Sequence, residues 1–170
     1  MRRILPMGNA GEMIVQPIQS DEYRVLSDMV GELLNEIMDK IHVQAFHFNQ
    51  AETEARAKDL VSRGKYWVFM AKEAVSGELV GFVSLYESYA LYAEGAYGTM
   101  PELYVRPQWR SRNIGEAMLM EVKKFAASKA WKRLEVTTPP LPEFDRTLKF
   151  YQFHGFEIAG GRKLKLDIGV

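Results

Sequence analysis

The stretch LYVRPQWRSRNIGEAMLMEV, Leu103–Val122, decides the fold of this chain. It opens as a β-like run, passes through three arginines and an Asn-Ile-Gly, and continues at once as an amphipathic helix. Pro107 lacks a backbone N–H and pushes Arg106 toward an extended conformation, so we expect the strand to end at that point. The chain must then reverse direction into a helix that begins near Asn113.

This turn has the properties of an anion-binding site. The first backbone N–H groups of a helix have no intrahelical partner, and the helix dipole places partial positive charge on them. Gly115 allows a ligand to approach the backbone closely, and Asn113 tolerates a left-handed conformation. Arg110 and Arg112 add positive charge. A solvated turn with ordinary arginines fits the same residues, so this stretch alone leaves both interpretations open.

Two helices are predicted before this motif. Ser20 has the chemistry of an N-cap, and the two acidic residues after it would lie in the first turn. Asn49, with Glu52 three residues later, predicts the start of a second helix that ends at Gly64. The apolar positions of the first helix recur at helical spacing: Leu26, Val30, Leu33, Ile37 and Ile41.

The strands are predicted from short apolar or alternating runs between turn residues. We expect strands at residues 13–18, 66–71, 78–87, 99–105 and 133–138. The second and third of these form a hairpin around Ser76-Gly77, and residues 89–98 form a loop. A last helix spans residues 144–154, and Gly160-Gly161 between two alternating runs predicts a closing hairpin.

Helices interrupt these strands without strict alternation, so we predict an α/β (α+β) fold with a mixed, mostly antiparallel central sheet flanked by helices. A chain of 170 residues that is 47% hydrophobic can bury one proper core and is too short for two ordinary domains. We therefore expect a flexible tail at residues 1–12 and a single domain at residues 13–170.

Composition restricts the function. Lys+Arg and Asp+Glu number 22 each, so no global charge attracts nucleic acid or an anionic membrane, and no apolar run approaches the length of a membrane span. The chain has no cysteine, and its three histidines lack a third ligand at useful spacing, so we expect no metal. Neither Gly-x-Gly-x-x-Gly nor Gly-Lys-Ser/Thr occurs. We expect a soluble, cytoplasmic protein.

The residues of the opening stretch carry a resemblance to a known family. Leu103, Val105 and Pro107, followed by Arg110-x-x-Asn113-x-Gly115, resemble the acetyl-CoA pyrophosphate signature of the GNAT superfamily of N-acetyltransferases. Asn113 stands where the family usually has its first glycine. Downstream, LKFYQFHGFEI (residues 148–158) is similar to the family's Leu/Phe-Tyr-x-x-x-Gly-Phe element. The two motifs occur in the family's order.

The resemblance implies a transferase that uses acetyl-CoA as co-substrate and assigns roles to residues. Tyr151 would be the general acid for the departing CoA thiolate, and Glu102 or Glu135 would be the base, with Glu102 slightly preferred. Apart from the resemblance, a Schellman-type helix end at Gly155 would bring Phe156 back against Phe150 or Tyr151 and so fix the position of the tyrosine. Backbone and side-chain groups would bind the cofactor at Leu103, Tyr104, Val105, Arg110, Ser111, Arg112, Asn113, Ile114, Gly115 and Glu116.

The acceptor would be a primary amine of a small molecule or peptide, and a homodimer is left open. Two regions could hold this amine. Tyrosines and carboxylates gather around the loop before the motif and could bind a polyamine-like or aminoglycoside-like cation; they are Tyr86, Tyr89, Tyr92, Tyr97, Tyr104, Glu87 and Glu94. In similar proteins the linker that contains His42, Phe46 and His47 often shapes the acceptor pocket.

Two other functions fit parts of the sequence. A non-catalytic acyl-CoA sensor would keep the phosphate-binding turn without needing Tyr151. An RNA-binding module could use interleaved basic and aromatic residues, although the net charge of zero argues against it; they are Arg106, Arg110, Arg112, Lys123, Lys124, Lys132, Arg133, Trp109 and Trp131. Thiol release from acetyl-CoA separates the enzyme from the sensor.

Overall fold

A computed structural model describes residues 11–169. The chain divides into two compact units, one up to Thr137 and the other from Thr138, and each is described by itself. Residues 1–10 of the predicted flexible tail lie outside the described part of the chain. Gly11 and Glu12 lead directly into the first strand.

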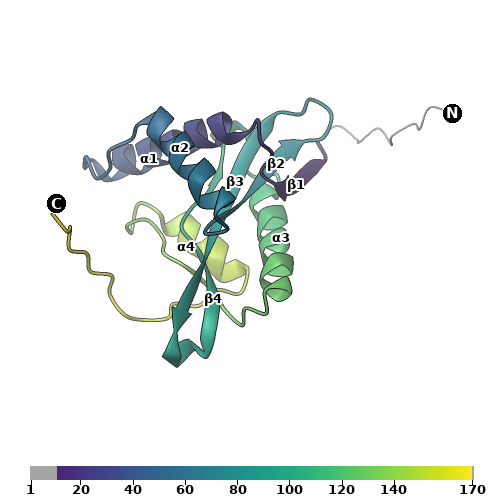
Figure 1. Cartoon of the computed structure of the whole chain (residues 1–170). Helices are drawn as coiled ribbons and strands as arrows, with labels where there is room; N and C mark the ends of the chain where they lie inside the picture. The colour runs from purple at the N-terminus through teal and green to yellow at the C-terminus, as the bar shows by residue number, and fades with distance from the viewer. Residues whose placement is uncertain (1–10, 170) are drawn as a thin grey trace. The chain divides into compact units, whose positions relative to one another are not determined.

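Six strands in the described part of the first unit form one mixed sheet, and their order is β1-β2-β3-β4-β6, with β5 also paired to β3 (Figure 1). The strands are β1 (Met13–Pro17), β2 (Trp67–Glu73), β3 (Leu79–Ala90), β4 (Gly95–Met100), β5 (Leu103–Val105) and β6 (Leu134–Val136). All pairs are antiparallel except β4 with β6. Pro17 lies on the edge strand β1, where a missing N–H costs no hydrogen bond within the sheet.

The helices are α1 (Tyr23–Ile41), α2 (Gln50–Ser62), α3 (Ile114–Ser128) and α4 (Asp145–Phe153), with 3-10 turns at Leu91–Ala93 and Pro107–Trp109. The Asn49 side chain accepts a hydrogen bond from the Glu52 N–H at 3.0 Å, which confirms that cap. Ser20 is not the cap of α1. The helix begins at Tyr23, and Asp21 and Glu22 precede it. The Glu22 carboxylate accepts the Gln19 N–H instead, at 3.2 Å, and closes a turn before the helix.

Alternation along the strands gives the sheet two buried faces. Val68, Met70 and Phe82 pack against Leu26 and Met29 of α1, and α2 adds apolar side chains to the same cluster. On the opposite face the Trp67 and Phe69 rings meet Phe125 of α3, with centroids 5.2 and 5.6 Å away. Helices α1 and α2 therefore cover one face of the sheet and α3 covers the other (Figure 1). The predicted mixed, mostly antiparallel sheet flanked by helices is confirmed.

The segment between β3 and the motif differs from the prediction. Residues 89–98, predicted as a loop, form the end of β3, a short 3-10 turn and the start of β4, because this hairpin pairs in register from Tyr86↔Thr99 to Ala90↔Gly95. The predicted strand 99–105 is two strands, interrupted at Pro101 and Glu102. The register with β3 shifts by one residue across this interruption. That shift turns β5 away from the line of β4.

The second unit contains α4 and the segment after it. Gly155 has a φ of +91°, and the Phe156 N–H donates to the Tyr151 carbonyl at 3.0 Å, so the helix ends in a Schellman motif, as predicted. The predicted closing hairpin is wrong, because residues 156–169 contain no strand. Ile158, Leu164, Leu166 and Ile168 stay largely exposed. Alternation by itself does not stabilise a two-stranded hairpin without a surface to bury.

Among residues 11–169, none of the helices combines the length and the apolar character needed to cross a bilayer.

Candidate active site

The turn between β5 and α3 presents unpaired backbone amides. The first helical hydrogen bond runs from the Ala117 N–H to the Asn113 carbonyl, so the N–H groups of Ile114, Gly115 and Glu116 precede the ladder. Within residues 11–169 no side chain caps this end. Asn113 adopts the left-handed conformation expected for it, with φ 59°. The predicted geometry of an anion site at a helix start is therefore present.

The left-handed residues of this turn include one that the motif did not indicate. Ser111 has a φ of 61°, so two left-handed residues flank Arg112. Alternating conformations of this kind turn successive N–H groups toward one concave side, which favours anions. The Arg112 guanidinium lies over the Trp109 ring, 4.9 Å from its centroid, and is held at the rim of the turn.

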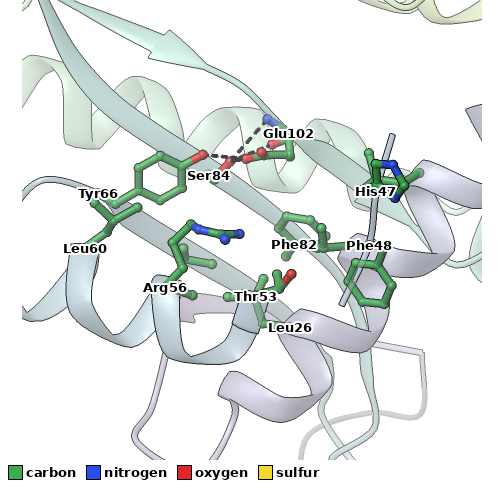
Figure 2. Close-up of a pocket in the computed structure, with 14 residues that line it drawn as sticks. Leu26, His47, Phe48, Thr53, Arg56, Leu60, Tyr66, Phe82, Ser84 and Glu102 are labelled. Carbon is green, nitrogen blue, oxygen red and sulfur yellow. Dashed lines mark hydrogen bonds between the residues drawn. The ribbon is translucent and has the colours of Figure 1, made fainter. Parts of the chain in front are cut away.

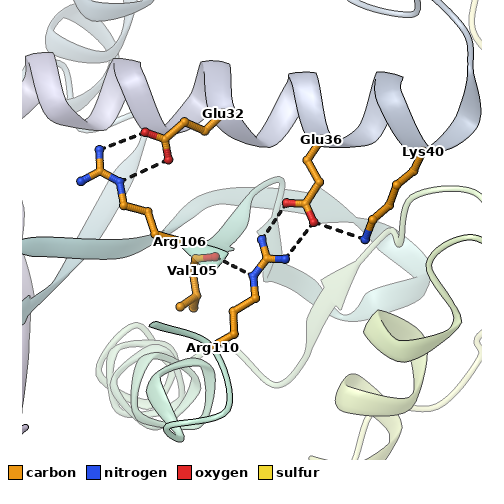
Figure 3. Close-up of polar contacts among 6 residues, drawn as sticks. All are labelled: Glu32, Glu36, Lys40, Val105, Arg106 and Arg110. Carbon is orange, nitrogen blue, oxygen red and sulfur yellow. Dashed lines mark hydrogen bonds and ion pairs between the residues drawn. The ribbon is translucent and has the colours of Figure 1, made fainter. Parts of the chain in front are cut away.

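Arg110 ties the turn to α1 (Figure 3). Its guanidinium donates two hydrogen bonds to the Glu36 carboxylate, at 2.8 and 2.6 Å, and its Nε donates to the Val105 carbonyl at 2.8 Å. The Arg110 hydrogen bond is the largest cause that lowers the pKa of Glu36. One turn earlier on the same helix, Glu32 receives two bonds from Arg106, at 3.2 and 3.0 Å. Arg110 therefore positions the turn, and its charge is already matched by a carboxylate.

Strand β5 has one paired edge and one open edge. The Arg106 N–H donates to Val80 and the Ser84 N–H donates to Glu102, so Tyr104 between them also faces β3. Antiparallel alternation then points the N–H and C=O groups of Leu103 and Val105 to the opposite side. Of these four groups, only the Val105 carbonyl has a hydrogen-bond partner among residues 11–169, namely Arg110. Strand β6 pairs with β4 only as far as Met100, so no strand among residues 11–169 pairs with this edge of β5.

A cavity of about 190 Å³ lies between the sheet, α1 and α2 (Figure 2). Its walls are mostly apolar and include Leu26, Val30, Leu34, Phe48, Leu60 and Phe82. The Phe48 ring fits against α1 because residue 31 is glycine; a Cβ there would lie 2.5 Å from the ring. The polar groups of the lining are His47, Thr53, Arg56, Tyr66, Ser84 and Glu102. This cavity meets the motif strand through Glu102, the residue before β5.

Two hydroxyl groups hold the Glu102 carboxylate (Figure 2). The Tyr66 hydroxyl donates to Glu102 Oε2 at 2.7 Å, and Ser84 Oγ donates to the same oxygen. The other oxygen, Oε1, has no hydrogen-bond partner within the described residues. Burial and the neighbouring Glu102 charge raise the pKa of the Tyr66 phenol, so the phenol stays protonated and remains a donor. The carboxylate is thus oriented through one oxygen and keeps the other free.

The second candidate base, Glu135, lies in β6 opposite Thr99 of β4. Its carboxylate forms an ion pair with Arg133 at 2.9 Å and does not line the cavity. The geometry therefore favours Glu102 of the two predicted carboxylates. Tyr66 and Ser84 were missed by the sequence reasoning. Alternation with Val68 and Phe82 could have placed both on the α1 face of the sheet.

Three of the five tyrosines proposed as a cation site, Tyr92, Tyr97 and Tyr104, already face arginines of this chain. The Arg133 guanidinium lies over the rings of Tyr97 and Tyr92, 4.9 and 5.6 Å from their centroids. Glu94 pairs with Lys132, and Glu87 accepts hydrogen bonds from Trp131 and Tyr89. The basic residues proposed for RNA are also largely occupied by carboxylates or rings, as at Arg106, Arg110, Arg112, Lys124, Lys132 and Arg133.

Tyr151 lies near the end of α4 in the second unit. It is 5% exposed, and the Phe156 ring packs against it with centroids 5.3 Å apart. Burial raises the pKa of its phenol above the ordinary value, which keeps the group protonated at neutral pH. The predicted return of Phe156 onto this tyrosine is therefore confirmed, whereas the role of Tyr151 as an acid stays a prediction.

Of the linker residues named from sequence, His47 lines the cavity, and Phe48 replaces the expected Phe46 there. His42 ends α1 in a left-handed conformation. Within residues 11–169, no group of three or more His, Asp or Glu side chains is arranged to hold a metal ion.

The fold is that of acetyltransferases. An acetyltransferase from Trypanosoma brucei shares 20% identity at a TM-score of 0.68, covering 92% of this chain and 100% of that one. An aminoglycoside N-acetyltransferase in complex with CoA shares 15% identity at a TM-score of 0.75, covering 96% and 99%. A ribosomal-protein-alanine N-acetyltransferase from Brucella melitensis shares 17% identity at a TM-score of 0.67, covering 91% and 99%.

The family follows from the sequence match. Residues 62–158, more than half of the chain, match the model of the acetyltransferase (GNAT) domain. The chain belongs to this family, as the motifs predicted. No curated protein matches the sequence. The match spans strands β2 to β6, the turn, α3 and α4, and it agrees with a single mixed α/β domain.

Proposed function

We propose that this protein is an acetyl-CoA-dependent N-acetyltransferase that transfers the acetyl group to a primary amine by direct attack in a ternary complex. One observation carries the proposal. Glu102 places a carboxylate with one free oxygen in a small cavity, immediately before the open edge of β5. An amine in the cavity and a thioester along the strand would meet at this residue.

Acetyl-CoA fits the open groups of the chain. We assign the pyrophosphate to the N–H groups of Ile114, Gly115 and Glu116, where no side chain among residues 11–169 caps the helix. The pantetheine arm, which carries amides, would hydrogen-bond the free groups of Leu103 and Val105. CoA in the structure of the aminoglycoside N-acetyltransferase, which shares this fold, supports the choice of co-substrate.

The reaction needs one base and one acid. Only a neutral amine attacks a thioester, so Glu102 Oε1 would take the proton that the amine loses. The amine nitrogen forms a bond to the acetyl carbon, and the carbon–sulfur bond breaks. Tyr151 would give its proton to the departing thiolate. The chain's contribution is then largely positioning, and no covalent enzyme intermediate is needed.

We do not take the identity of the acceptor amine from the similar structures. One of them is named for aminoglycosides and another for a ribosomal-protein alanine, so the fold is compatible with different amines. A non-catalytic acyl-CoA sensor is the alternative; it would need the turn at Asn113 and would leave the free oxygen of Glu102 without a use. A cytoplasmic location and a homodimer stay predictions.

The test has two parts. Acetyl-CoA should raise the melting temperature, whereas acetyl-pantetheine and adenosine, which lack the pyrophosphate, should raise it much less. Thiol release from acetyl-CoA should then depend on an added primary amine. Equal stabilisation by all three compounds would contradict the phosphate site, and tight binding without any amine-dependent thiol release would favour the sensor.

A further inference from the structure

The cavity between α1, α2 and the sheet has the size of a small acceptor. Ligand pockets for drug-sized molecules measure about 300–1,000 Å³, and an apolar cavity of about 150 Å³ accommodates a benzene ring. At about 190 Å³ the cavity suits a single aliphatic or aromatic group. The cavity is open to solvent, so an oligosaccharide or a long polyamine would place only one of its groups inside.

The charged groups of the cavity lining narrow the class of acceptor further. Among the described residues that line the cavity, Glu102 is the one carboxylate and Arg56 is the one guanidinium. A polycationic amine would need several carboxylates, and the acidic residues near the tyrosines, Glu87 and Glu94, are already bonded within the chain. One negative and one positive group on an apolar surface match a zwitterion instead.

Arg56 is available to bind. It projects from α2 into the cavity (Figure 2), and within residues 11–169 it forms no ion pair or hydrogen bond. Two other arginines near α1 and α2 are engaged, Arg106 with Glu32 and Arg63 with Asp59. A guanidinium presents paired donors that fit a carboxylate in bidentate geometry.

We propose that the acceptor is a free amino acid with a small apolar side chain. Its amine would face Glu102 Oε1, its carboxylate would bind Arg56, and its side chain would lie against Leu26, Val30 and Phe82. This inference rests on the proposed function and specifies its substrate class. The amine nitrogen gains the acetyl group, CoA leaves as the thiol, and the product is an N-acetylamino acid.

The experiment compares matched amines with the full-length protein. Thiol release is measured with L-leucine, with 3-methylbutylamine, which is leucine without its carboxylate, with glycine, with cadaverine and with kanamycin. We expect leucine to have the highest kcat/KM. Its advantage over 3-methylbutylamine should be about tenfold or more, the range of a charged hydrogen bond. Glycine should be poorer because it lacks the apolar group.

Arg56→Gln should bring the leucine to 3-methylbutylamine ratio close to one. The matched control is Arg63→Gln, an exposed arginine at the C-terminal cap of α2 that is paired with Asp59, and it should keep the wild-type ratio. Should Arg56→Gln fail to fold, Arg56→Lys serves instead and should lower the ratio in part. An unchanged ratio in a folded Arg56 variant would overturn the proposal.

Failure of this inference differs from failure of the proposed function. Fastest turnover with cadaverine or kanamycin would reject an amino acid acceptor and leave the acetyltransferase in place. No thiol release with any amine, together with no stabilisation by acetyl-CoA, would reject both.

Discussion

At the scale of single residues, the free oxygen of Glu102 is the feature with the most chemical consequence. Tyr66 and Ser84 both donate to Oε2, so the carboxylate is oriented while Oε1 stays available to a proton. An exposed glutamate with mobile rotamers would have to be ordered for each reaction. In the folded protein the hydroxyl groups of Tyr66 and Ser84 already hold the Glu102 carboxylate in one orientation.

Glu102→Gln should lower turnover about 10²- to 10⁴-fold, because glutamine keeps the shape and the hydrogen bonds but cannot take a proton. The increase in melting temperature produced by acetyl-CoA should not change. Steady-state thiol release and thermal unfolding measure the two effects. Glu121→Gln, which changes a half-buried carboxylate of α3 paired with Lys124, is the control. A large loss in Glu135→Gln and none in Glu102→Gln would place the base on β6.

Tyr151→Phe should reduce kcat strongly and leave acetyl-CoA binding intact, because it removes one proton and hardly any volume. Burial raises the pKa of this phenol, so wild-type protein keeps the proton throughout the neutral range. Turnover is measured beside calorimetric binding of acetyl-CoA. A wild-type rate in the variant would remove the acid role and leave Tyr151 as a packing partner of Phe156.

At the scale of elements, α1 orders the turn between β5 and α3 through ion pairs. Glu32 and Glu36 lie one turn apart on α1 and bind Arg106 and Arg110, at the two ends of the Pro107–Trp109 turn (Figure 3). Close packing supports the strand itself. A Cβ on Gly81 of β3 would lie 2.6 Å from the Tyr104 carbonyl, so glycine allows β5 to pair there.

Glu36→Gln should weaken acetyl-CoA binding, because it releases Arg110 and with it the turn and the Val105 carbonyl. A partly exposed ion pair contributes about 1 kcal/mol, so the Kd should rise about fivefold. Isothermal calorimetry measures it, with Lys40→Gln as a control that alters the same ion-pair group without touching the turn. Tighter binding in Glu36→Gln would mean that a freed Arg110 contacts the phosphates directly.

At the scale of the whole molecule, stability rests on a sheet buried on both faces, with hairpin β2–β3 at its centre. The turn of this hairpin is organised by Glu73, whose carboxylate accepts the Ser76 hydroxyl and N–H, both at 2.6 Å, and the Gly11 N–H at 3.2 Å. These hydrogen bonds lower the pKa of Glu73 to about 2, and the bond from the Ser76 hydroxyl is the largest cause.

This depressed pKa predicts a pH dependence of unfolding. Because the folded pKa lies below the ordinary value of 4.5, the stabilisation by Glu73 is complete above about pH 4.5 and is lost as the pH falls toward 2. Wild-type protein should therefore exceed Glu73→Gln in urea midpoint at pH 6, with the difference shrinking between pH 4.5 and 2. A difference independent of pH would show that the carboxylate charge plays no part.

The sequence by itself determined the features that depend on neighbours along the chain. Pro107, Asn113 and the apolar spacing of α3 specify a strand, a turn and a helix through local backbone rules, and Gly155 specifies the end of α4 in the same way. The family followed, because its motifs are local. The prediction of Ser20 as a helix cap was wrong because Glu22 closes a turn before α1. The predicted hairpin at residues 156–168 was wrong because its apolar side chains have no surface on which to be buried.

Only the tertiary structure decided which side chains meet. Tyr66 and Ser84 reach Glu102 across 36 and 18 positions of the chain, and Arg110 reaches Glu36 across 74. Such contacts depend on strand register and on helix placement, and a register shift of one residue moves each side chain to the other face of the sheet. For that reason the two hydroxyls that orient Glu102, and the place of Arg56 in the same cavity, could not be inferred from sequence, which gave Glu102 only a slight preference over Glu135.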